Sequence, residues 1–226
     1  MTDLRLVVFD VDGTLIDSQA HIVSAMTKAF DTVGIKPPKR ERILGIVGLS
    51  LPEAITQLAP MARDGQVPAL VEAYKAAFRT MREAGQAEAG SPLYPNVRQV
   101  LDQLNQDPRT LLGLATGKSR RGLNSLIDAH DLRGIFVTQQ CADDHPSKPN
   151  PAMLMAALAE AGTAARHAVM IGDTSYDMEM ARAAGMVAIG VSWGYHARDQ
   201  LGAAHMVIDD IRLLPGLLAQ IWGQMA

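Results

Sequence analysis

One decapeptide near the N-terminus restricts the fold of this chain more than any other: Leu6-Val7-Val8-Phe9-Asp10-Val11-Asp12-Gly13-Thr14-Leu15. An apolar run of strand length stops at two aspartates, which a parallel sheet would deliver to the edge where open α/β folds bind their ligands. Two carboxylates so close together repel each other unless a cation lies between them. A glycine then permits a tight turn, and a threonine hydroxyl can hydrogen-bond locally. A strand followed by an ordinary Asp-Gly turn is the plainer interpretation.

The second half of the chain alternates between short β-branched runs and helical periodicity. We expect strands at residues 111–115, 135–137, 168–172, 187–191 and 206–208, and helices at 119–130, 151–161, 176–184 and 213–222. Short strands that alternate with helices predict a parallel sheet covered by helices on both faces.

The segment between the first strand and this alternating region has no strand pattern. Helical spacing runs from His21 to Val33, in a short piece that ends near Leu44, from Pro52 onward, and from Ala69 to Ala84. Residues 85–95 are rich in Gly and Pro, which suits a hinge. The predicted fold class is therefore α/β, a Rossmann-like parallel sheet core (residues 1–17 and 89–226) with an inserted all-helical unit (residues 18–88).

Composition excludes several classes of protein. At 226 residues the chain can bury a large core without a disulfide or a structural metal. The net charge of −3 and the dispersed Lys and Arg residues argue against a nucleic-acid surface. The one cysteine, Cys141, fits a reducing compartment. We see neither a signal peptide nor an apolar stretch of about 18 residues, so we expect a cytoplasmic protein without a membrane span.

Three further segments that follow predicted strands carry groups suited to phosphate chemistry. Thr116-Gly117-Lys118-Ser119 offers a hydroxyl and backbone N–H groups at a helix start. Lys148 stands between Ser147 and Pro149 in a loop stiffened by two prolines, where a lysine is often merely a surface residue. The strand at 168–172 ends at Asp173, and Asp177 follows in the first helical turn, where it could equally serve the helix dipole.

These four motifs, in this order at successive strand ends, resemble those of the haloacid dehalogenase-like hydrolases. The resemblance spans the whole chain, and the helical insert looks like the small cap domain of the subgroup that contains phosphoglycolate phosphatases and β-phosphoglucomutases. The stretch from Asp173 to Gly185, with Trp193-Gly194-Tyr195-His196 after it, looks most similar to phosphoglycolate phosphatase-like members.

The resemblance implies a role for each acidic motif residue. Asp10 would be the nucleophile that forms an aspartyl-phosphate. Asp12 would protonate the leaving alkoxide and then deprotonate the hydrolytic water. Mg²⁺ would be held by Asp10, the backbone carbonyl of Asp12 and Asp173. Asp177 would bind a water of the metal or orient Lys148.

The resemblance also implies which residues bind the rest of the substrate. Thr116, the Gly117 N–H and Lys148 would neutralise the phosphoryl oxygens. The cap loop around Gly48, Leu49 and Ser50 lies where relatives select the leaving group. Its apolar, Gly-rich character favours a small substrate, and cap closure would exclude water.

The expected activity is thus Mg²⁺-dependent hydrolysis of a small phosphate monoester, phosphoglycolate-like, with a small molecule as the binding partner. The oligomeric state stays open. A phosphosugar mutase of the β-phosphoglucomutase type would use the same motifs, and a non-catalytic binding module could keep the same fold. A carbon–halogen hydrolase is disfavoured because it would not need Asp12. A phosphonate-cleaving enzyme would need a cap lysine such as Lys36 or Lys39.

Overall fold

The computed structural model describes residues 4–84 and 91–223. In this part of the chain, six parallel strands form one sheet in the order β3-β2-β1-β4-β5-β6. The strands are β1 (Arg5–Phe9), β2 (Thr110–Thr116), β3 (Thr138–Cys141), β4 (Ala168–Gly172), β5 (Val187–Val191) and β6 (Met206–Ile208). Strand order reverses between β1 and β4, and ligands of such sheets bind beyond the carboxyl ends of the strands at that point. The predicted α/β class with a parallel sheet is confirmed.

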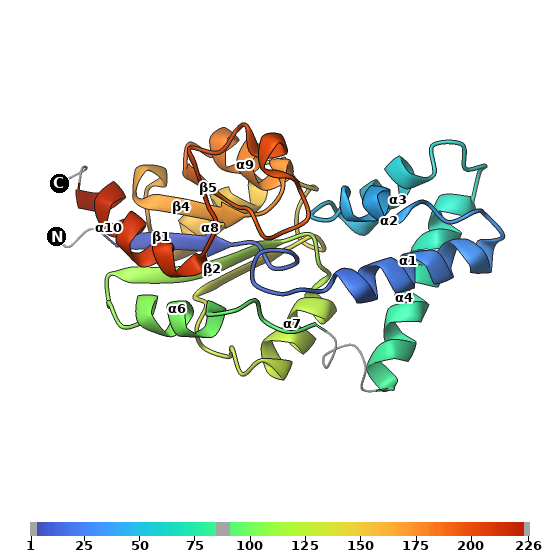
Figure 1. Ribbon diagram of the computed structural model, residues 1–226, viewed down its shortest axis with the longest axis horizontal. Helices are drawn as coiled ribbons and strands as arrows, with labels where there is room; N and C mark the ends of the chain where they lie inside the picture. The colour runs from blue at the N-terminus through green and yellow to red at the C-terminus, as the bar shows by residue number, and fades with distance from the viewer. Residues whose placement is uncertain (1–3, 85–90, 224–226) are drawn as a thin grey trace.

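Helices cover both faces of the sheet (Figure 1). On one side lie α8 (Ala152–Ala161) and α9 (Ser175–Ala183), and on the other α6 (Val97–Leu104), α7 (Arg120–Ala129) and α10 (Leu214–Gly223). Strand β1 serves both layers because successive side chains of a strand point to opposite faces. Leu6 and Val8 pack in the cluster under α8 and α9, whereas Val7 and Phe9 pack with α6, α7 and α10.

The helices between β1 and β2 form a separate group beside the sheet. They are α1 (Gln19–Val33), α2 (Arg40–Leu44), α3 (Leu51–Leu58) and α4 (Gln66–Glu83), shown on the right of Figure 1. They have a hydrophobic cluster of their own, in which Phe30 and Ile55 are fully buried. The interior of this group is therefore distinct from the two clusters that flank the sheet.

The chain leaves and re-enters the α/β unit through two segments that pair with each other. Ile16 forms an antiparallel bridge with Leu93. The Asp17 N–H donates to the carbonyl of Pro92 at 2.9 Å, and the Tyr94 N–H donates to that of Leu15 at 2.9 Å. The predicted boundary between residues 88 and 89, and most of the predicted hinge, fall in 85–90, outside the described residues.

Two sequence predictions differ from the structure. The strand predicted at 135–137 is wrong: Ile135 and Phe136 pack into the core, and β3 begins at Thr138, paired with Gly113 of β2. The apolar run at 135–137 favoured the wrong segment, and the polar residues of β3 are accommodated because they are hydrogen-bonded: the buried Thr138 hydroxyl donates to Glu160 at 2.6 Å, and the buried Gln140 amide donates to Thr138 at 2.7 Å. Helix α6 was not predicted at all.

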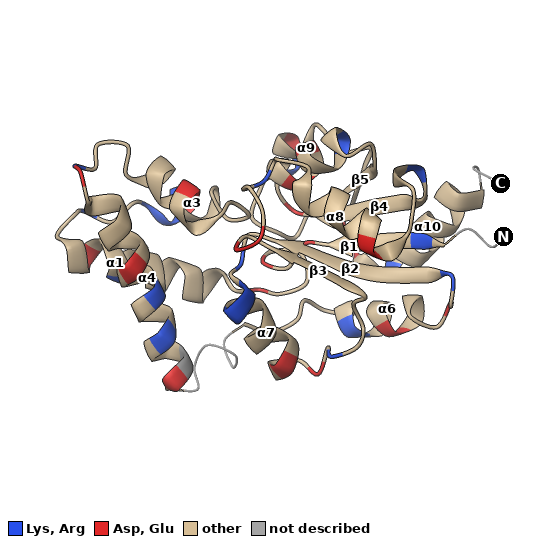
Figure 2. Ribbon diagram, turned by 180° about the vertical axis from the view of Figure 1, so that it is seen from behind, with Lys and Arg blue, Asp and Glu red and all other residues tan. Residues whose placement is uncertain are grey.

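The charged residues of the surface are mixed in sign. Figure 2 shows basic and acidic residues interspersed along the ribbon of both units. Among the described residues, no helix is long and apolar enough to span a membrane.

Candidate active site

The predicted site residues come together at the carboxyl edge of the sheet. Asp10 follows β1, Thr116 ends β2 and Asp173 follows β4, and all three are at most 1% exposed. The Asp10 N–H donates to the carbonyl of Ile171 at 2.8 Å, which ties the end of β1 to β4. Strand order therefore brings residues more than 160 positions apart into one buried group.

Lys148 is the cation of this group. It is 2% exposed, and its Nζ lies 2.6 Å from Asp10 Oδ1 and 2.6 Å from Asp177 Oδ1. Burial disfavours the charged ammonium, but the negative charges of Asp10 and Asp177 outweigh it and raise the pKa of Lys148. The lysine that sequence alone could equally assign to the surface is thus buried between two carboxylates.

Asp177 also completes the start of helix α9. Its Oδ2 accepts hydrogen bonds from the Thr174 N–H at 3.1 Å and the Thr174 hydroxyl at 2.6 Å, and Thr174 in turn caps the Asp177 N–H. This reciprocal arrangement is a capping box. Asp177 therefore orients Lys148 and caps the helix at once, so the two interpretations weighed for it are compatible.

Asp173 is fixed by donors from two sides. The Thr14 hydroxyl donates to Oδ1 at 2.9 Å, and the Tyr195 N–H donates to Oδ2 at 2.8 Å. Glycines make room for it: a Cβ at Gly13 would lie 2.2 Å from Asp173, and one at Gly194 would lie 2.1 Å away. At Gly13 the φ of +89° disfavours a side chain as well.

The acidic cluster has more negative charge than its lysine can neutralise. Carboxylate oxygens of Asp10, Asp173 and Asp177 lie within 4.8 Å of one another, so three carboxylates against one ammonium leave a formal charge of −2. Burial raises the pKa of Asp10 to about 7, with Lys148 opposing the shift, and burial together with Asp10 and Asp177 raises that of Asp173 well above its usual range. Asp10 Oδ2 is buried and has no hydrogen-bond partner among the described residues.

Such a group of hard oxygen ligands suits a divalent cation. The excess charge and the unpartnered oxygen of Asp10 are both explained by a cation that binds there, and its charge would reverse the upward pKa shifts. The residues present therefore fit a metal ion held by the buried carboxylates.

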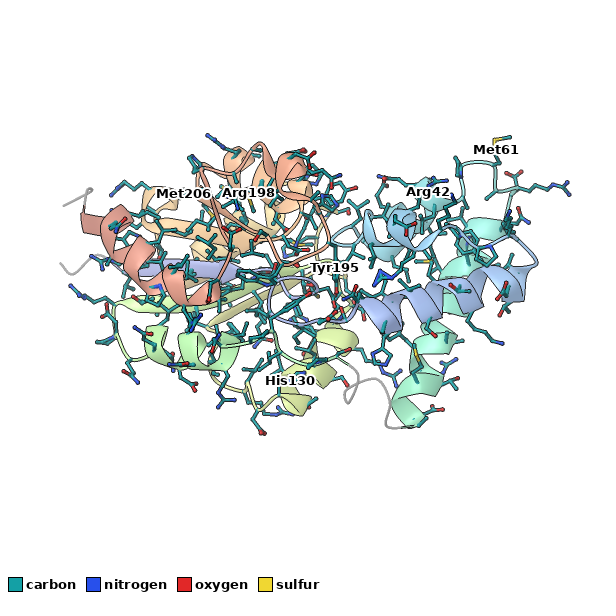
Figure 3. The ribbon with its side chains drawn as sticks, in the orientation of Figure 1. Arg42, Met61, His130, Tyr195, Arg198 and Met206 are labelled. Atoms are coloured by element: carbon teal, nitrogen blue, oxygen red, sulfur yellow. The ribbon has the colours of Figure 1, made fainter. Side chains whose placement is uncertain are left out.

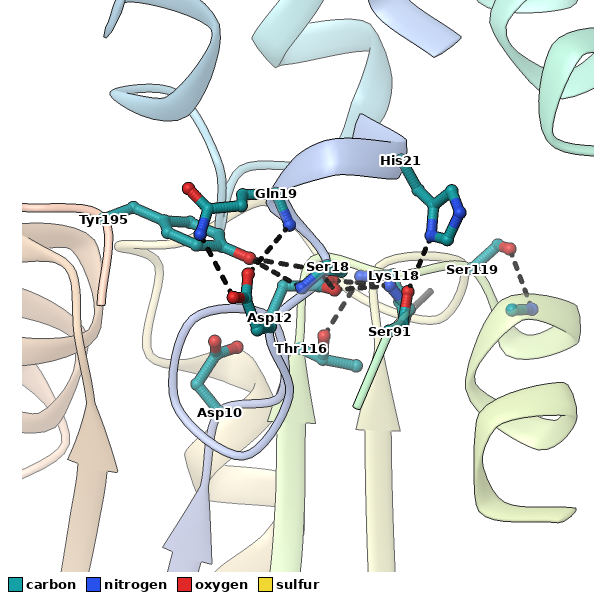
Figure 4. Close-up of polar contacts among 12 residues, drawn as sticks. Asp10, Asp12, Ser18, Gln19, His21, Ser91, Thr116, Lys118, Ser119 and Tyr195 are labelled. Carbon is teal, nitrogen blue, oxygen red and sulfur yellow. Dashed lines mark hydrogen bonds and ion pairs between the residues drawn. The ribbon is translucent and has the colours of Figure 1, made fainter. Parts of the chain in front are cut away.

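Asp12 lies beside this cluster but has its own partners, drawn in Figure 4. Lys118 Nζ lies 2.6 Å from Asp12 Oδ1 and 2.7 Å from Oδ2, and the Ser18 hydroxyl also donates to Oδ1. Ser18 in turn contacts the hydroxyl of Tyr195, 3.1 Å from both its N and its Oγ. Lys118, Ser18 and Tyr195 were not predicted as site residues, although Lys118 and Tyr195 stand inside motifs that the sequence had singled out.

The loop that contains Gly48, Leu49 and Ser50 touches the α/β unit next to the site. The Ser50 N–H donates to Ser147 Oγ at 2.8 Å, directly before Lys148 in sequence. A Cβ at Gly117 would lie 2.5 Å from the carbonyl oxygen of Gly48 and 2.6 Å from that of Leu49. Backbone therefore packs on backbone here, and only glycine at position 117 allows the approach.

Two side chains of the α/β unit hold the start of the same loop. The Tyr176 hydroxyl and His196 Nε2 each lie 3.1 Å from the carbonyl oxygen of Gly45. Tyr195, beside them, packs against the hydrophobic cluster of the helical group, and Figure 3 places it where the two units meet. Val47 belongs to that cluster, so its side chain packs within the helical group.

Comparison with known proteins agrees with the fold. Residues 7–191 match the family model described as haloacid dehalogenase-like hydrolase. The chain belongs to this family of hydrolases.

Relatives and a solved structure extend the match over nearly the whole chain. The protein named "Probable phosphatase IndB" of Dickeya dadantii is 39% identical over 202 residues, which cover 88% of this chain and 86% of the relative. A phosphoglycolate phosphatase of Pseudomonas fluorescens is 32% identical and covers 95% of this chain and 80% of its own length. The crystal structure of a hydrolase from Pseudomonas syringae superposes with a TM-score of 0.82 at 25% identity, over 94% of this chain and 97% of that one.

Burial of an excess carboxylate should make metal-free stability depend on pH. Since the pKa of Asp10 is raised to about 7 from about 4 when unfolded, its protonated form stabilises the fold fully below pH 4, and this stabilisation is lost as pH rises through 7. With EDTA present, the free energy of unfolding of wild type should fall between pH 5 and pH 8. That of Asp10→Asn should not show this fall, so the variant should be more stable relative to wild type at pH 8 than at pH 5. Urea unfolding at both values measures it, with the exposed Asp64→Asn as control. A variant-to-wild-type difference that is equal at the two pH values would contradict the expectation.

Proposed function

We propose that this protein is a Mg²⁺-dependent phosphomonoesterase that hydrolyses a small phosphorylated metabolite, phosphoglycolate-like, through an aspartyl-phosphate on Asp10. One observation carries the proposal: Asp10, with a buried and unpartnered oxygen, lies among Asp173, Asp177 and Lys148 at the sheet edge. The names of the relatives, a phosphatase and a phosphoglycolate phosphatase, support the same reaction.

In the first half of the reaction Asp10 attacks phosphorus while the ester P–O bond breaks. Asp12 gives its proton to the leaving oxygen, so the alcohol departs neutral. Mg²⁺, held by Asp10, the Asp12 carbonyl and Asp173, would reduce the repulsion between the nucleophile and the anionic phosphate. The Thr116 hydroxyl, the Gly117 N–H and the Lys148 ammonium bind the phosphoryl oxygens.

In the second half Asp12, now a carboxylate, takes a proton from water. That water attacks the phosphorus of the aspartyl-phosphate, the bond to Asp10 breaks, and inorganic phosphate leaves. Lys148 keeps its proton throughout, because its pKa is raised by the carboxylates on both sides. One residue thus serves as acid and then as base, and both halves use the same phosphate contacts.

We further propose that residues 18–88 act as a cap over a core of residues 1–17 and 89–226. The separate hydrophobic cluster of the helical group and the paired segments around Ile16 and Leu93 support this division. With the loop seated on Gly117, Asp10 is 1% exposed and Asp12 8% exposed, so a substrate reaches them only when the cap moves.

The decisive experiment is a panel of phosphate esters assayed for phosphate release with Mg²⁺ and with EDTA, in wild type and Asp10→Asn. We expect release that needs Mg²⁺, that needs no bisphosphate activator, and that falls by several orders of magnitude in the variant, because an amide cannot attack phosphorus. Asp64→Asn is the control. Turnover of sugar phosphates only with a bisphosphate activator would favour a mutase, and activity retained in Asp10→Asn would refute the mechanism.

Metal dependence should separate the two other acids of the cluster. Asp173 has no lysine partner among the described residues, whereas Asp177 is engaged by Lys148 and Thr174. We expect Asp173→Asn to raise the Mg²⁺ concentration for half-maximal activity more than tenfold and further than Asp177→Asn does. A titration of activity and of thermal stabilisation by Mg²⁺ measures both, and a larger effect at Asp177 would reverse the assignment.

The loop should select the leaving group. Leu49 is 6% exposed and its carbonyl lies over Gly117, so we expect Leu49→Ala to change the ratio of kcat/KM between phosphoglycolate and p-nitrophenyl phosphate severalfold at unchanged Mg²⁺ affinity. Leu58→Ala, equally buried but inside the helical cluster, is the control for lost packing. If both variants lose activity on both esters alike, the loop does not determine specificity.

A further inference from the structure

The mechanism above leaves one cation of the site without a function. Lys118, the third residue of the Thr-Gly-Lys motif, directs its ammonium to both carboxylate oxygens of Asp12, at 2.6 and 2.7 Å. The side chains are only 18% and 10% exposed, so solvent screens the pair far less than an ion pair on the surface.

The two lysines of the site pair with three of its four acids. Lys148 pairs with Asp10 and Asp177, and Lys118 pairs with Asp12 (Figure 4 draws the latter pair). The backbone N–H of Lys118 donates to Thr116 Oγ1 at 3.2 Å, and its carbonyl accepts from the Ala142 N–H at 3.0 Å. The loop that presents the phosphate-binding hydroxyl therefore also fixes the origin of the Lys118 side chain.

The other contacts of Asp12 come from the segment that leads into α1. The Ser18 hydroxyl donates to Oδ1, so among the described residues this oxygen accepts from two donors and Oδ2 from Lys118 alone. A carboxylate held by hydrogen bonds at both oxygens has a defined direction. When Asp12 gives up its proton, the charge that develops lies against Lys118.

We propose that Lys118 is a positioning residue for the acid–base work of Asp12, and that it matters most for esters with a basic leaving alcohol. The proposal rests on the proposed phosphatase function. The proton moves between Asp12 and the leaving oxygen, whereas the ammonium keeps its three protons and stabilises the Asp12 carboxylate left behind. A nitrophenolate leaves without a proton and needs this help little.

Three esters and two substitutions at one position test the proposal. The esters are phosphoglycolate, ethyl phosphate (an equally basic leaving alcohol without a carboxylate) and p-nitrophenyl phosphate, all with saturating Mg²⁺. In Lys118→Met we expect kcat to fall about 10²-fold or more for both alkyl esters, because general acid catalysis contributes a factor of about that size. For p-nitrophenyl phosphate we expect kcat to fall less than about tenfold. Lys118→Arg should restore part of the loss, and the exposed Arg121→Met should match wild type.

Each other outcome overturns the assignment in its own way. An equal loss on all three esters, with lowered thermal stability, would make the pair merely structural. A rise in KM confined to phosphoglycolate would make Lys118 a binding group for the substrate carboxylate. If wild type hydrolyses none of the three esters, the proposed function itself fails, whereas an active wild type with a fully active Lys118→Met refutes only the role of Lys118.

Discussion

The ammonium of Lys148, enclosed between Asp10 and Asp177, is the interaction on which the rest of the site depends. Without it, three carboxylates would be buried within 4.8 Å of one another with no positive charge in contact. Burial of charge is costly unless the charge is paired, so the sheet edge can collect these acids only because the loop at Ser147-Lys148 inserts a cation among them. Even so, the pKa of Asp10 stays at about 7, which is the sign of an incompletely neutralised site.

Most of the fold could be predicted because it depends on local periodicity. Strands β4 and β5, and β1 after Arg5, are continuous apolar runs, as expected for strands buried on both faces. The strand before Lys148 could not be placed from periodicity, because the polar residues of β3 are buried in hydrogen bonds while the apolar residues before them belong to the core. Helix α6 begins at Val97, after Asn96, whose backbone is left-handed (φ 64°) and whose side chain makes no capping hydrogen bond.

The site residues that stand in motifs could be predicted, and those that reach the site only through long-range contacts could not. Asp10, Thr116 and Asp173 were predictable because each stands in a short motif at the end of a strand, and parallel strands align their carboxyl ends; Lys148 stands in a short motif in the loop between β3 and α8. The contacts of Lys118 and Tyr195 with Asp12 and Ser18 could not be predicted, since they join residues 106 and 177 positions apart that no motif relates to each other. Sequence spacing indicates which edge a residue reaches but not which neighbour it then meets.

The contacts between the two units lie beside the residues that would carry the chemistry. Gly117 follows Thr116, Ser147 precedes Lys148, and Tyr176 precedes Asp177, and each touches the loop from Gly45 to Ser50. A movement of this loop would therefore act on the backbone next to the phosphate-binding residues, and a shift of the phosphate contacts would in turn disturb the loop. If these residues bind phosphate and the helical group closes over them, as proposed, the same few backbone positions would serve both purposes, and direct contact would couple the two without a longer path through the protein.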